Sequence, residues 1–243
     1  MSGSITLENR FGVNKMELIS LKYAIFVIVL LVLYYCFPKK YRWYVLLAGS
    51  MAYYVIICKW YVLFIIFTIC TTYGSTIWID KLLKKQNAIV KSHKEDWDRQ
   101  TRKDYKEKGR KKRVAVMLFA LLCNFGILAF LKYIPYAGEL GLLLPLGISF
   151  YTFQSMGYVM DVYREIVEPE KNFLKVALFV SFFPQIIQGP IAIYDKLAGQ
   201  LYEGHSLRLE NLQKGALLVL WGVMKKLVIA DRAVNIINFV MDK

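Results

Sequence analysis

The chain has 243 residues, of which 57% are hydrophobic and 15% aromatic, and its formal net charge is +14. Soluble domains average roughly 45–50% apolar residues and alternate apolar with polar positions, so this composition argues against an ordinary soluble domain. The positive charge would suit a nucleic-acid-binding protein, but no motif that reads nucleic acid accompanies it, and we expect no nucleic-acid partner.

Six uncharged apolar runs follow one another along the chain. They are Tyr23–Pro38, Trp43–Cys58, Trp60–Ile79, Val114–Leu131, Leu140–Met160 and Val176–Tyr194. The first begins too late for a secretory signal and lacks a small-residue cleavage site, so it is predicted to be a retained transmembrane helix. The sequence therefore predicts an all-α, polytopic integral membrane helical bundle in contact with the lipid bilayer. This bundle is predicted to form one domain over residues 1–243, with six to seven hydrophobic segments.

Positive charge is concentrated in the segment Lys81–Arg113, which holds 14 Lys or Arg and 5 Asp or Glu residues. Loops rich in Lys and Arg stay on the cytoplasmic side of a membrane, where anionic lipid also attracts them. We therefore predict a cytoplasmic basic loop at 81–113. Alternation then places the link Pro38–Arg42 and residues 161–171 inside as well, and the N-terminus outside.

Polar side chains interrupt the run Leu140–Met160, which is long enough to cross a hydrocarbon core of about 30 Å. Gln154, Tyr158 and Asp161 are spaced i, i+4 and i+7, and Tyr151 lies one turn earlier. A helix would place all four on one stripe. Polar groups at membrane depth normally face a bundle interior or a wet cavity, so this stripe is a candidate functional site.

Helix-breaking residues accompany the polar ones. Pro145, Gly147 and Gly157 leave two structures open for the fifth run, a full span or a re-entrant segment. In the sixth run, Gln185 and Gln188 are framed by Pro184 and by a Gly-Pro pair. Proline frees a backbone carbonyl, which then needs another partner.

Two interpretations of these polar residues remain open. They could be contacts between membrane helices, each contributing about 0.6–2 kcal/mol. They could also form the wall of a polar passage through the bilayer.

The last part of the chain is less regular. Gly215–Met224 is uncharged, and Lys225, Lys226 and Asp231 follow it closely. Such a segment is too polar for a lipid-facing span and too apolar for a loop, so we expect it to pack against a partner.

The four cysteines each lie in an apolar run without metal-site spacing, and we expect small buried hydrophobic side chains and no metal. Neither His93 nor His205 lies in a recognisable catalytic motif.

Three stretches resemble the membrane-bound O-acyltransferases, in particular the bacterial alginate O-acetyltransferase branch. They read LPLGISFYTFQSMGYVMDVYR, FVSFFPQIIQGPI and WGVMKKLVIAD. The resemblance implies a multi-pass enzyme of the bacterial inner or plasma membrane. It would transfer an acetyl or other acyl group from a cytoplasmic donor, such as acetyl-CoA or an acyl carrier protein, to an extracytoplasmic polysaccharide or cell-envelope polymer. No tightly bound cofactor is implied.

The resembled family also has a tunnel through the membrane. The candidate tunnel-lining residues are Tyr151, Gln154, Tyr158, Asp161, Arg164, Gln185, Gln188, Gly189, Pro190, Lys225, Lys226 and Asp231.

The family's histidine motif does not occur before Lys243, so no catalytic residue is assigned. The chain resembles the N-terminal half of such an enzyme. We expect it to be incomplete at the C-terminus, to be inactive alone, and to require a chain that carries the other half. A transporter or flippase half and a non-catalytic structural membrane subunit stay open as alternatives.

The predicted topology can be tested with single cysteines introduced between residues 81 and 113. A membrane-impermeant maleimide should leave them unlabelled in intact cells and label them after permeabilisation, because the positive-inside rule places them in the cytoplasm. Labelling in intact cells would contradict the assignment.

Overall fold

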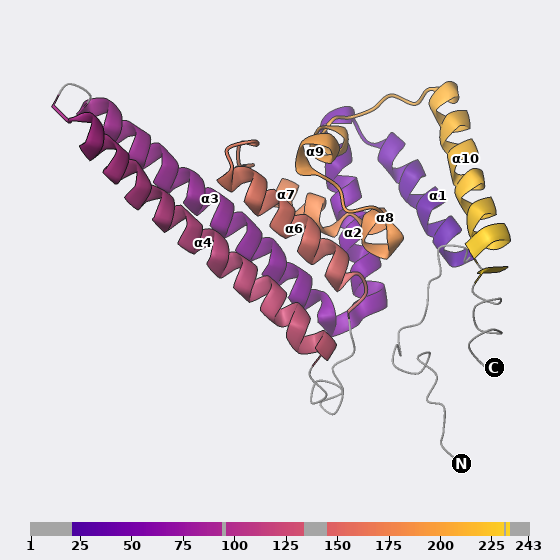
Figure 1. The fold of residues 1–243 in the computed structure, drawn as a ribbon. Helices are drawn as coiled ribbons and strands as arrows, with labels where there is room; N and C mark the ends of the chain where they lie inside the picture. The colour runs from indigo at the N-terminus through magenta and orange to yellow at the C-terminus, as the bar shows by residue number, and fades with distance from the viewer. Residues whose placement is uncertain (1–20, 94–95, 134–144, 231, 234–243) are drawn as a thin grey trace, which may run out of the picture.

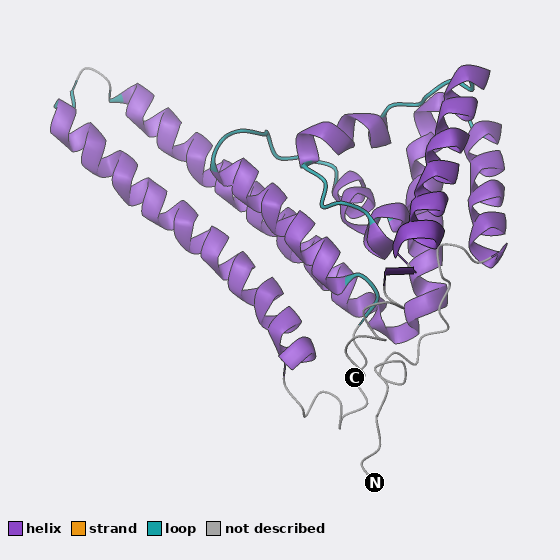
Figure 2. Ribbon diagram, turned by 45° about the vertical axis from the view of Figure 1, so that its right-hand side comes forward, coloured by secondary structure: helices purple, strands orange, loops and turns teal. Residues whose placement is uncertain are grey.

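The computed structural model describes residues 21–93, 96–133, 145–230 and 232–233, and these residues form helices and connecting segments without a strand (Figure 2). The helices are α1 (Leu21–Cys36), α2 (Arg42–Cys58), α3 (Val62–Ser92), α4 (Arg99–Tyr133), α6 (Ile148–Tyr163), α7 (Phe173–Ser181), α8 (Phe183–Gln188), α9 (Tyr194–Tyr202) and α10 (Leu209–Met224) (Figure 1). Short 3₁₀ turns at Lys39–Tyr41 and Lys59–Tyr61 flank α2, and a π-helical turn, Lys225–Ala230, follows α10.

A long antiparallel hairpin of α3 and α4 dominates one side of the molecule (Figure 1). Its helices have 31 and 35 residues, which corresponds to lengths of about 46 and 52 Å at 1.5 Å per residue. The predicted loop at 81–113 is therefore wrong for most of its length, because α3 continues to Ser92 and α4 begins at Arg99. Lys, Arg, Gln and Glu are strong helix formers, and here charge did not imply irregular structure.

A side chain that crosses between the helices joins the charged parts of the hairpin. The Nε2 atom of Gln86 in α3 donates to the carbonyl of Lys106 in α4 at 3.1 Å. Gly109 makes this approach possible, because a Cβ atom there would lie 2.4 Å from the Gln86 Oε1 atom.

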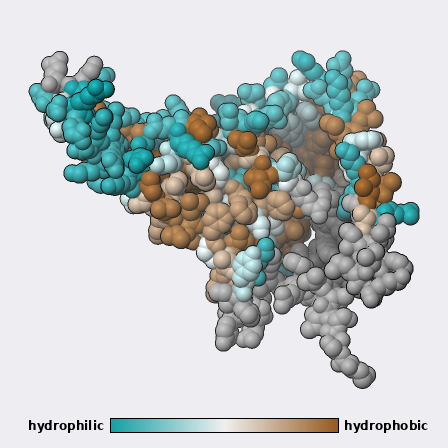
Figure 3. Space-filling model, in the orientation of Figure 1, coloured by the Kyte–Doolittle hydropathy of each residue, from teal (hydrophilic) through white to brown (hydrophobic). Residues whose placement is uncertain are grey.

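Two helical stretches, Lys39–Ser92 and Arg99–Tyr133, are long and apolar enough by length and composition to cross a membrane. Much of their outer surface is apolar and exposed, as at Trp60, Leu63 and Leu122, with exposed fractions of 85%, 62% and 72%. Figure 3 shows hydrophobic residues gathered over the middle of the molecule and hydrophilic residues along its upper edge.

The buried core lies where α6 and α7 pack against α2 and α3. It contains apolar residues such as Val159, Leu178 and Phe179, all fully buried. It also contains many polar side chains, and those on α3 include Thr68, Thr72, Ser75 and Thr76. The inward face of α3 therefore combines these hydroxyls with the buried Ile65, Ile69 and Ile79, while its outer face carries exposed apolar residues.

The sixth apolar run is shorter as a helix than its sequence suggested, and the fifth is described only from residue 145. In the fifth, α6 begins at Ile148, after Gly147 in the left-handed conformation with φ +70°. The sixth is not a single helix, because α7 ends at Ser181 and α8 begins at Phe183, with Pro184 in its first turn. Pro184 has no amide hydrogen, so it cannot continue α7.

The charged links lie together at one edge of the molecule. The links between α1 and α2, between α6 and α7 and between α9 and α10 are all toward the upper edge of Figure 1, as is the tip of the α3–α4 hairpin. Alternation predicted that the first two links share a side of the membrane with the basic segment, and their common edge in the structure is compatible with that prediction. Which side of a membrane this edge faces stays a prediction.

Arg42 fastens two of these links to each other. Its guanidinium group lies 5.3 Å from the ring centre of Tyr34 and 5.1 Å from that of Tyr35. Its Nε atom donates to the Phe37 carbonyl at 2.9 Å, and its Nη1 atom donates to the carbonyl of His205. The α9–α10 link is therefore held against the turn that joins α1 to α2.

Gly147 should tolerate no side chain. A Cβ atom there would lie 2.5 Å from the carbonyl oxygen of Ile186, and its positive φ is unfavourable for other residues. Gly147→Ala should lower the free energy of unfolding by about 1–3 kcal/mol, measured as thermal stability in detergent.

Gly157→Ala is the matched control, because this glycine is exposed within α6 and no atom would meet its Cβ atom. The control should be neutral or stabilising by up to about 1 kcal/mol. Equal effects of the two substitutions would contradict the packing argument.

Candidate functional site

The two polar sequence clusters meet in space. Helix α6 carries the first cluster and packs against α7, α8 and α9, which carry or flank the second. Gly147, just before α6, lies close to Ile186 of α8 and so joins the start of α6 to α8. Stretches separated by some thirty residues in sequence therefore form one buried junction, here called the α6–α8 junction.

Gln154 occupies the centre of this junction. Its side chain is 2% exposed, and its Nε2 atom donates to the carbonyl of Phe179 at 2.8 Å. That carbonyl belongs to the last turn of α7, where carbonyls lose their helical partners because the helix ends. Gln154 thus supplies the partner that a broken helix in this region was expected to need.

Tyr158 lies one turn further along α6 and is also buried. Its ring stacks on Tyr194 of α9 at 4.1 Å between centres, and its hydroxyl accepts a hydrogen bond from the Glu170 amide at 2.8 Å. Nearby, the Tyr202 hydroxyl donates to the carbonyl of Lys175 at 2.9 Å. Burial raises the pKa of Tyr202 above its ordinary value, so the phenol stays neutral and keeps this proton. These contacts attach α9 to α6 and α7.

Tyr151 faces the other side of the bundle, toward α2. Its ring packs edge-on against Tyr54 with 6.3 Å between centres, and both rings are almost completely buried. The hydroxyls of Tyr151 and Tyr54 have no hydrogen-bond partner among the described residues, nor do those of Ser155 and Thr72. A buried hydroxyl without a partner is costly, so this polar cluster lowers the stability of the bundle unless a further group satisfies it.

Gln185 closes the far end of the junction. Its Nε2 atom donates to the Pro190 carbonyl at 2.8 Å, which folds the Gly189-Pro190 turn back over α8. A Cβ atom at Gly189 would lie 2.7 Å from the Cα atom of Gln185, so this turn requires glycine. The Oε1 atom of Gln185 is buried and has no partner among the described residues.

The remaining predicted site residues are more dispersed. Asp161 is half-buried near the end of α6, and Arg164 is exposed as its C-cap. Gln188 ends α8, and its side chain lies outside the described part, as does Asp231. Lys225 and Lys226 lie in the π-helical turn after α10, a helix with no buried residue. The structure does not bring the two lysines to the α6–α8 junction (Figure 1).

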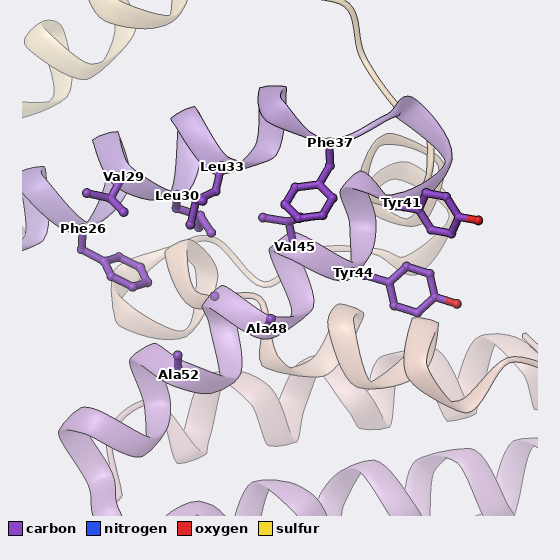
Figure 4. Close-up of a pocket in the computed structure, with 11 residues that line it drawn as sticks. Phe26, Val29, Leu30, Leu33, Phe37, Tyr41, Tyr44, Val45, Ala48 and Ala52 are labelled. Atoms are coloured by element: carbon purple, nitrogen blue, oxygen red, sulfur yellow. The ribbon is translucent and has the colours of Figure 1, made fainter.

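Two cavities are formed by residues that the sequence did not single out. One is an open apolar groove of about 870 Å³ between α1 and α2, lined by residues such as Phe26, Leu30, Leu33 and Val45 (Figure 4). The other is a polar cavity of about 460 Å³ beside the α3–α4 hairpin, next to the ion pair of Arg113 with Glu165. Both depend on long-range contacts, so no local sequence signal identifies them.

Neither histidine has the surroundings of a general base. His93 is exposed at the tip of the hairpin, stacked on Trp97, and its Nδ1 atom contacts Ser92. The Nε2 atom of His205 lies 3.0 Å from the Gln200 carbonyl in the α9–α10 link. No group of three or more potential metal ligands occurs among the residues that the structure describes.

An all-helical bundle with membrane-capable helices and a buried polar junction suits several classes of membrane protein, and comparison with known proteins narrows the choice. The chain is 31% identical to a peptidoglycan O-acetyltransferase of Helicobacter pylori over 52% of this chain and 31% of that protein. It is 40% identical to a probable alginate O-acetylase, AlgI, of Pseudomonas syringae over 37% of this chain and 17% of the relative. The corresponding Pseudomonas aeruginosa protein is 38% identical over similar shares.

The resemblance to the bacterial alginate O-acetyltransferase type is thereby confirmed. The matched stretches span less than a third of the length of these relatives. No family model matches the chain, and no solved structure matches it.

Gln154 can be tested as a structural contact. Gln154→Met keeps the size of the side chain but leaves the Phe179 carbonyl without its partner, so it should lower the free energy of unfolding by about 1–3 kcal/mol. Thermal unfolding in detergent measures this. Gln200→Met, at an exposed position of α9, should change nothing. A stable Gln154→Met variant would show that the hydrogen bond is dispensable.

Proposed function

We propose that this chain forms part of a membrane-embedded O-acyltransferase. The enzyme transfers an acetyl or other acyl group from a cytoplasmic donor, acetyl-CoA or an acyl carrier protein, to an extracytoplasmic polysaccharide or cell-envelope polymer. The single observation that supports this most is the similarity to proteins named for O-acetylation of alginate and of peptidoglycan. Both names specify an acetyl group and a glycan.

We also propose that the chain lies in the bacterial inner or plasma membrane, with several passes and the N-terminus outside, and the arrangement of the helices supports a membrane location. The apolar surfaces of α3 and α4 face outward, and the charged links share one edge. In lipid, a helix break is tolerated only where other groups satisfy its backbone. The break between α7 and α8 meets this requirement through Gln154 and Ser50, whose hydroxyl accepts from the Phe183 amide at 3.4 Å.

Within the proposed enzyme, the α6–α8 junction has two kinds of residue. Tyr151, Gln154 and Tyr158 are buried and make specific contacts, which suits residues that position the helices around a passage. Asp161 and Gln188 are placed at the ends of α6 and α8 and remain the candidates for lining that passage. Acyl transfer also requires a general base near the acceptor hydroxyl, and no described histidine at the junction provides one.

We therefore propose that the 243-residue chain transfers no acyl group alone and needs a further segment that supplies the base. The purified chain in lipid, given acetyl-CoA and a soluble glycan acceptor, should release no coenzyme A above background. Acyl transfer that His205→Ala abolishes would contradict this and would identify His205 as the base.

Asp161 and Gln188 can be tested in cells that contain the complete acetylation system. Asp161→Asn removes the charge of a half-buried side chain but keeps its size and hydrogen-bonding capacity, so the protein should accumulate normally. Gln188→Leu should also accumulate, because leucine suits lipid better than glutamine. If both residues line the passage, polysaccharide O-acetylation per folded molecule should fall by about tenfold, equivalent to 1.4 kcal/mol of transition-state stabilisation.

Matched controls lie on α9, where Asp195→Asn and Gln200→Leu make the same chemical changes at exposed positions. They should leave acetylation unchanged. A stable and fully active Asp161→Asn, Gln188→Leu double variant would end the passage hypothesis. A loss of thermal stability with unchanged activity per folded molecule would assign these residues to helix packing.

A further inference from the structure

The polar cavity beside the α3–α4 hairpin is built differently from the rest of the charged surface. It has a volume of about 460 Å³ and lies against α3, α4 and the residue Glu165, just after α6. Its charged and polar lining includes Gln86, Lys106, Glu107, Arg110, Arg113 and Glu165. Three of these are cations on α4 at spacing i, i+4 and i+7, so they form one stripe along the helix.

Arg113 is the buried member of the stripe. Its side chain is 10% exposed, and its Nη1 atom donates to the Oε1 atom of Glu165 at 2.7 Å. Its Nε atom is buried and has no acceptor among the described residues. A guanidinium group has five donors, and a buried charged donor without an acceptor is destabilising, so this group is incompletely satisfied by the protein.

Gln86, which lines the same cavity, has a hydrogen-bond acceptor without a donor in the described part of the chain. It is 6% exposed, and its Oε1 atom is buried without a donor among the described residues, although its Nε2 atom is bonded to Lys106. Both of these atoms have almost no accessible surface, so a ligand in the cavity would meet the exposed cations of the stripe and not these two atoms.

Glu165 adopts a backbone conformation that is unfavourable for a residue with a side chain. Its φ is +62°, at the position after a helix end where glycine is usual. The Ile166 amide donates to the Asp161 carbonyl at 3.0 Å and the Glu165 amide to the Val162 carbonyl at 3.1 Å, the pattern of a Schellman motif. A glutamate costs roughly 1–2 kcal/mol more than glycine in this conformation. Its carboxylate is what fixes Arg113 at the cavity.

The remaining cations of the stripe are available. Lys106 and Arg110 are exposed, and their side-chain nitrogens have no hydrogen bond or ion pair with the described residues. Glu107 forms a 3.5 Å ion pair with Lys111, outside the stripe, which reduces its repulsion toward an anion. The cavity lining therefore carries three positive groups and two carboxylates, and two of the cations, Lys106 and Arg110, form no ion pair with the described residues.

The position along the helices indicates what kind of anion would be present. Directly after Arg113, α4 carries no charged residue until Lys132, and α3 carries none between Val62 and Ile79. The cavity thus lies where the charged part of the hairpin meets its apolar part. In a membrane this is the level of lipid phosphates, and arginine binds phosphate oxygens in a bidentate manner.

We infer that this cavity binds a phosphate ester. The Lys106 and Arg110 side chains contact the phosphate oxygens, and the positive charge of Arg113 at the base of the cavity adds to the attraction. The ligand is a phospholipid headgroup or a soluble phosphate ester, which share this chemistry. The site is separate from the α6–α8 junction and does not depend on the proposed enzymatic function.

The inference can be tested on the 243-residue chain in an uncharged detergent by titration with three compounds. Dihexanoyl phosphatidylglycerol carries the phosphate on lipid tails, glycerol 3-phosphate carries it without tails, and dihexanoylglycerol carries the tails alone. The dissociation constant is measured from the rise in the unfolding midpoint with ligand concentration. A phosphate-bearing compound should bind, and dihexanoylglycerol should not.

The decisive variant is Lys106→Gln, Arg110→Gln, which changes two exposed side chains and preserves the Arg113–Glu165 pair. It should weaken phosphate binding by about tenfold or more. Lys108→Gln, Lys112→Gln is the matched control, because it removes two exposed positive charges with the same spacing on α4 but outside the cavity. This control should bind like the unchanged chain.

The titrations distinguish a lipid headgroup from a soluble phosphate ester, and the double variants test for non-specific attraction to a basic surface. Binding of the lipid alone identifies a headgroup site, and equal binding of glycerol 3-phosphate identifies a site for a soluble phosphate ester. Equal weakening in both double variants would mean diffuse attraction to a basic surface and would overturn the inference. Stabilisation by dihexanoylglycerol equal to that by the phospholipid, or no binding of either phosphate compound, would overturn it as well.

Discussion

The broken sixth run sets the main constraint on this fold. An apolar environment provides no water for the carbonyls released at the end of α7, so other side chains must satisfy them. Gln154 of α6 donates to the Phe179 carbonyl at 2.8 Å. The hydroxyl of Ser50, which lies in α2, accepts a hydrogen bond from the Phe183 amide. Three helices are thereby tied to one break. Gly147 packed against Ile186 and Tyr158 stacked on Tyr194 add further contacts around the same break.

The same constraint accounts for the polar side chains within an otherwise mainly apolar interior. On α3, the buried residues include Thr68, Thr72 and Thr76, whereas Leu63 and Trp78 are exposed. Short hydroxylated side chains let helices approach closely and can bond back to their own carbonyls, as Thr76 does to the Thr72 carbonyl at 2.9 Å. The unpaired hydroxyls of Tyr54 and Tyr151 are different, because they leave hydrogen-bonding capacity inside the bundle.

Sequence reasoning predicted the helical class, the breaks near Gly147 and Pro184 and the inward orientation of Tyr151, Gln154 and Tyr158. Each of these follows from local chemistry: hydrophobic runs, residues that cannot continue a helix, and polar spacing on one face. It missed the contacts of Arg113 with Glu165 and of Arg42 with His205, which join residues 52 and 163 positions apart. A charged residue alone carries no information about which distant partner it meets. The error at 81–113 had another cause, because charge was taken as evidence for a loop although these residues favour helices.

The length of the α3–α4 hairpin divides the basic segment into two electrostatic zones. From Asp80 to Ser92, α3 extends about 20 Å along its axis beyond its last apolar run. At physiological ionic strength, charges are screened over about 8 Å. In a membrane, Lys81 and the residues around Arg113 would therefore feel the lipid surface, whereas the hairpin tip near Trp97 would be electrically independent of it. The charge at the tip would then contribute little to contact with lipid, whereas the charge at the base would be close enough to interact with it.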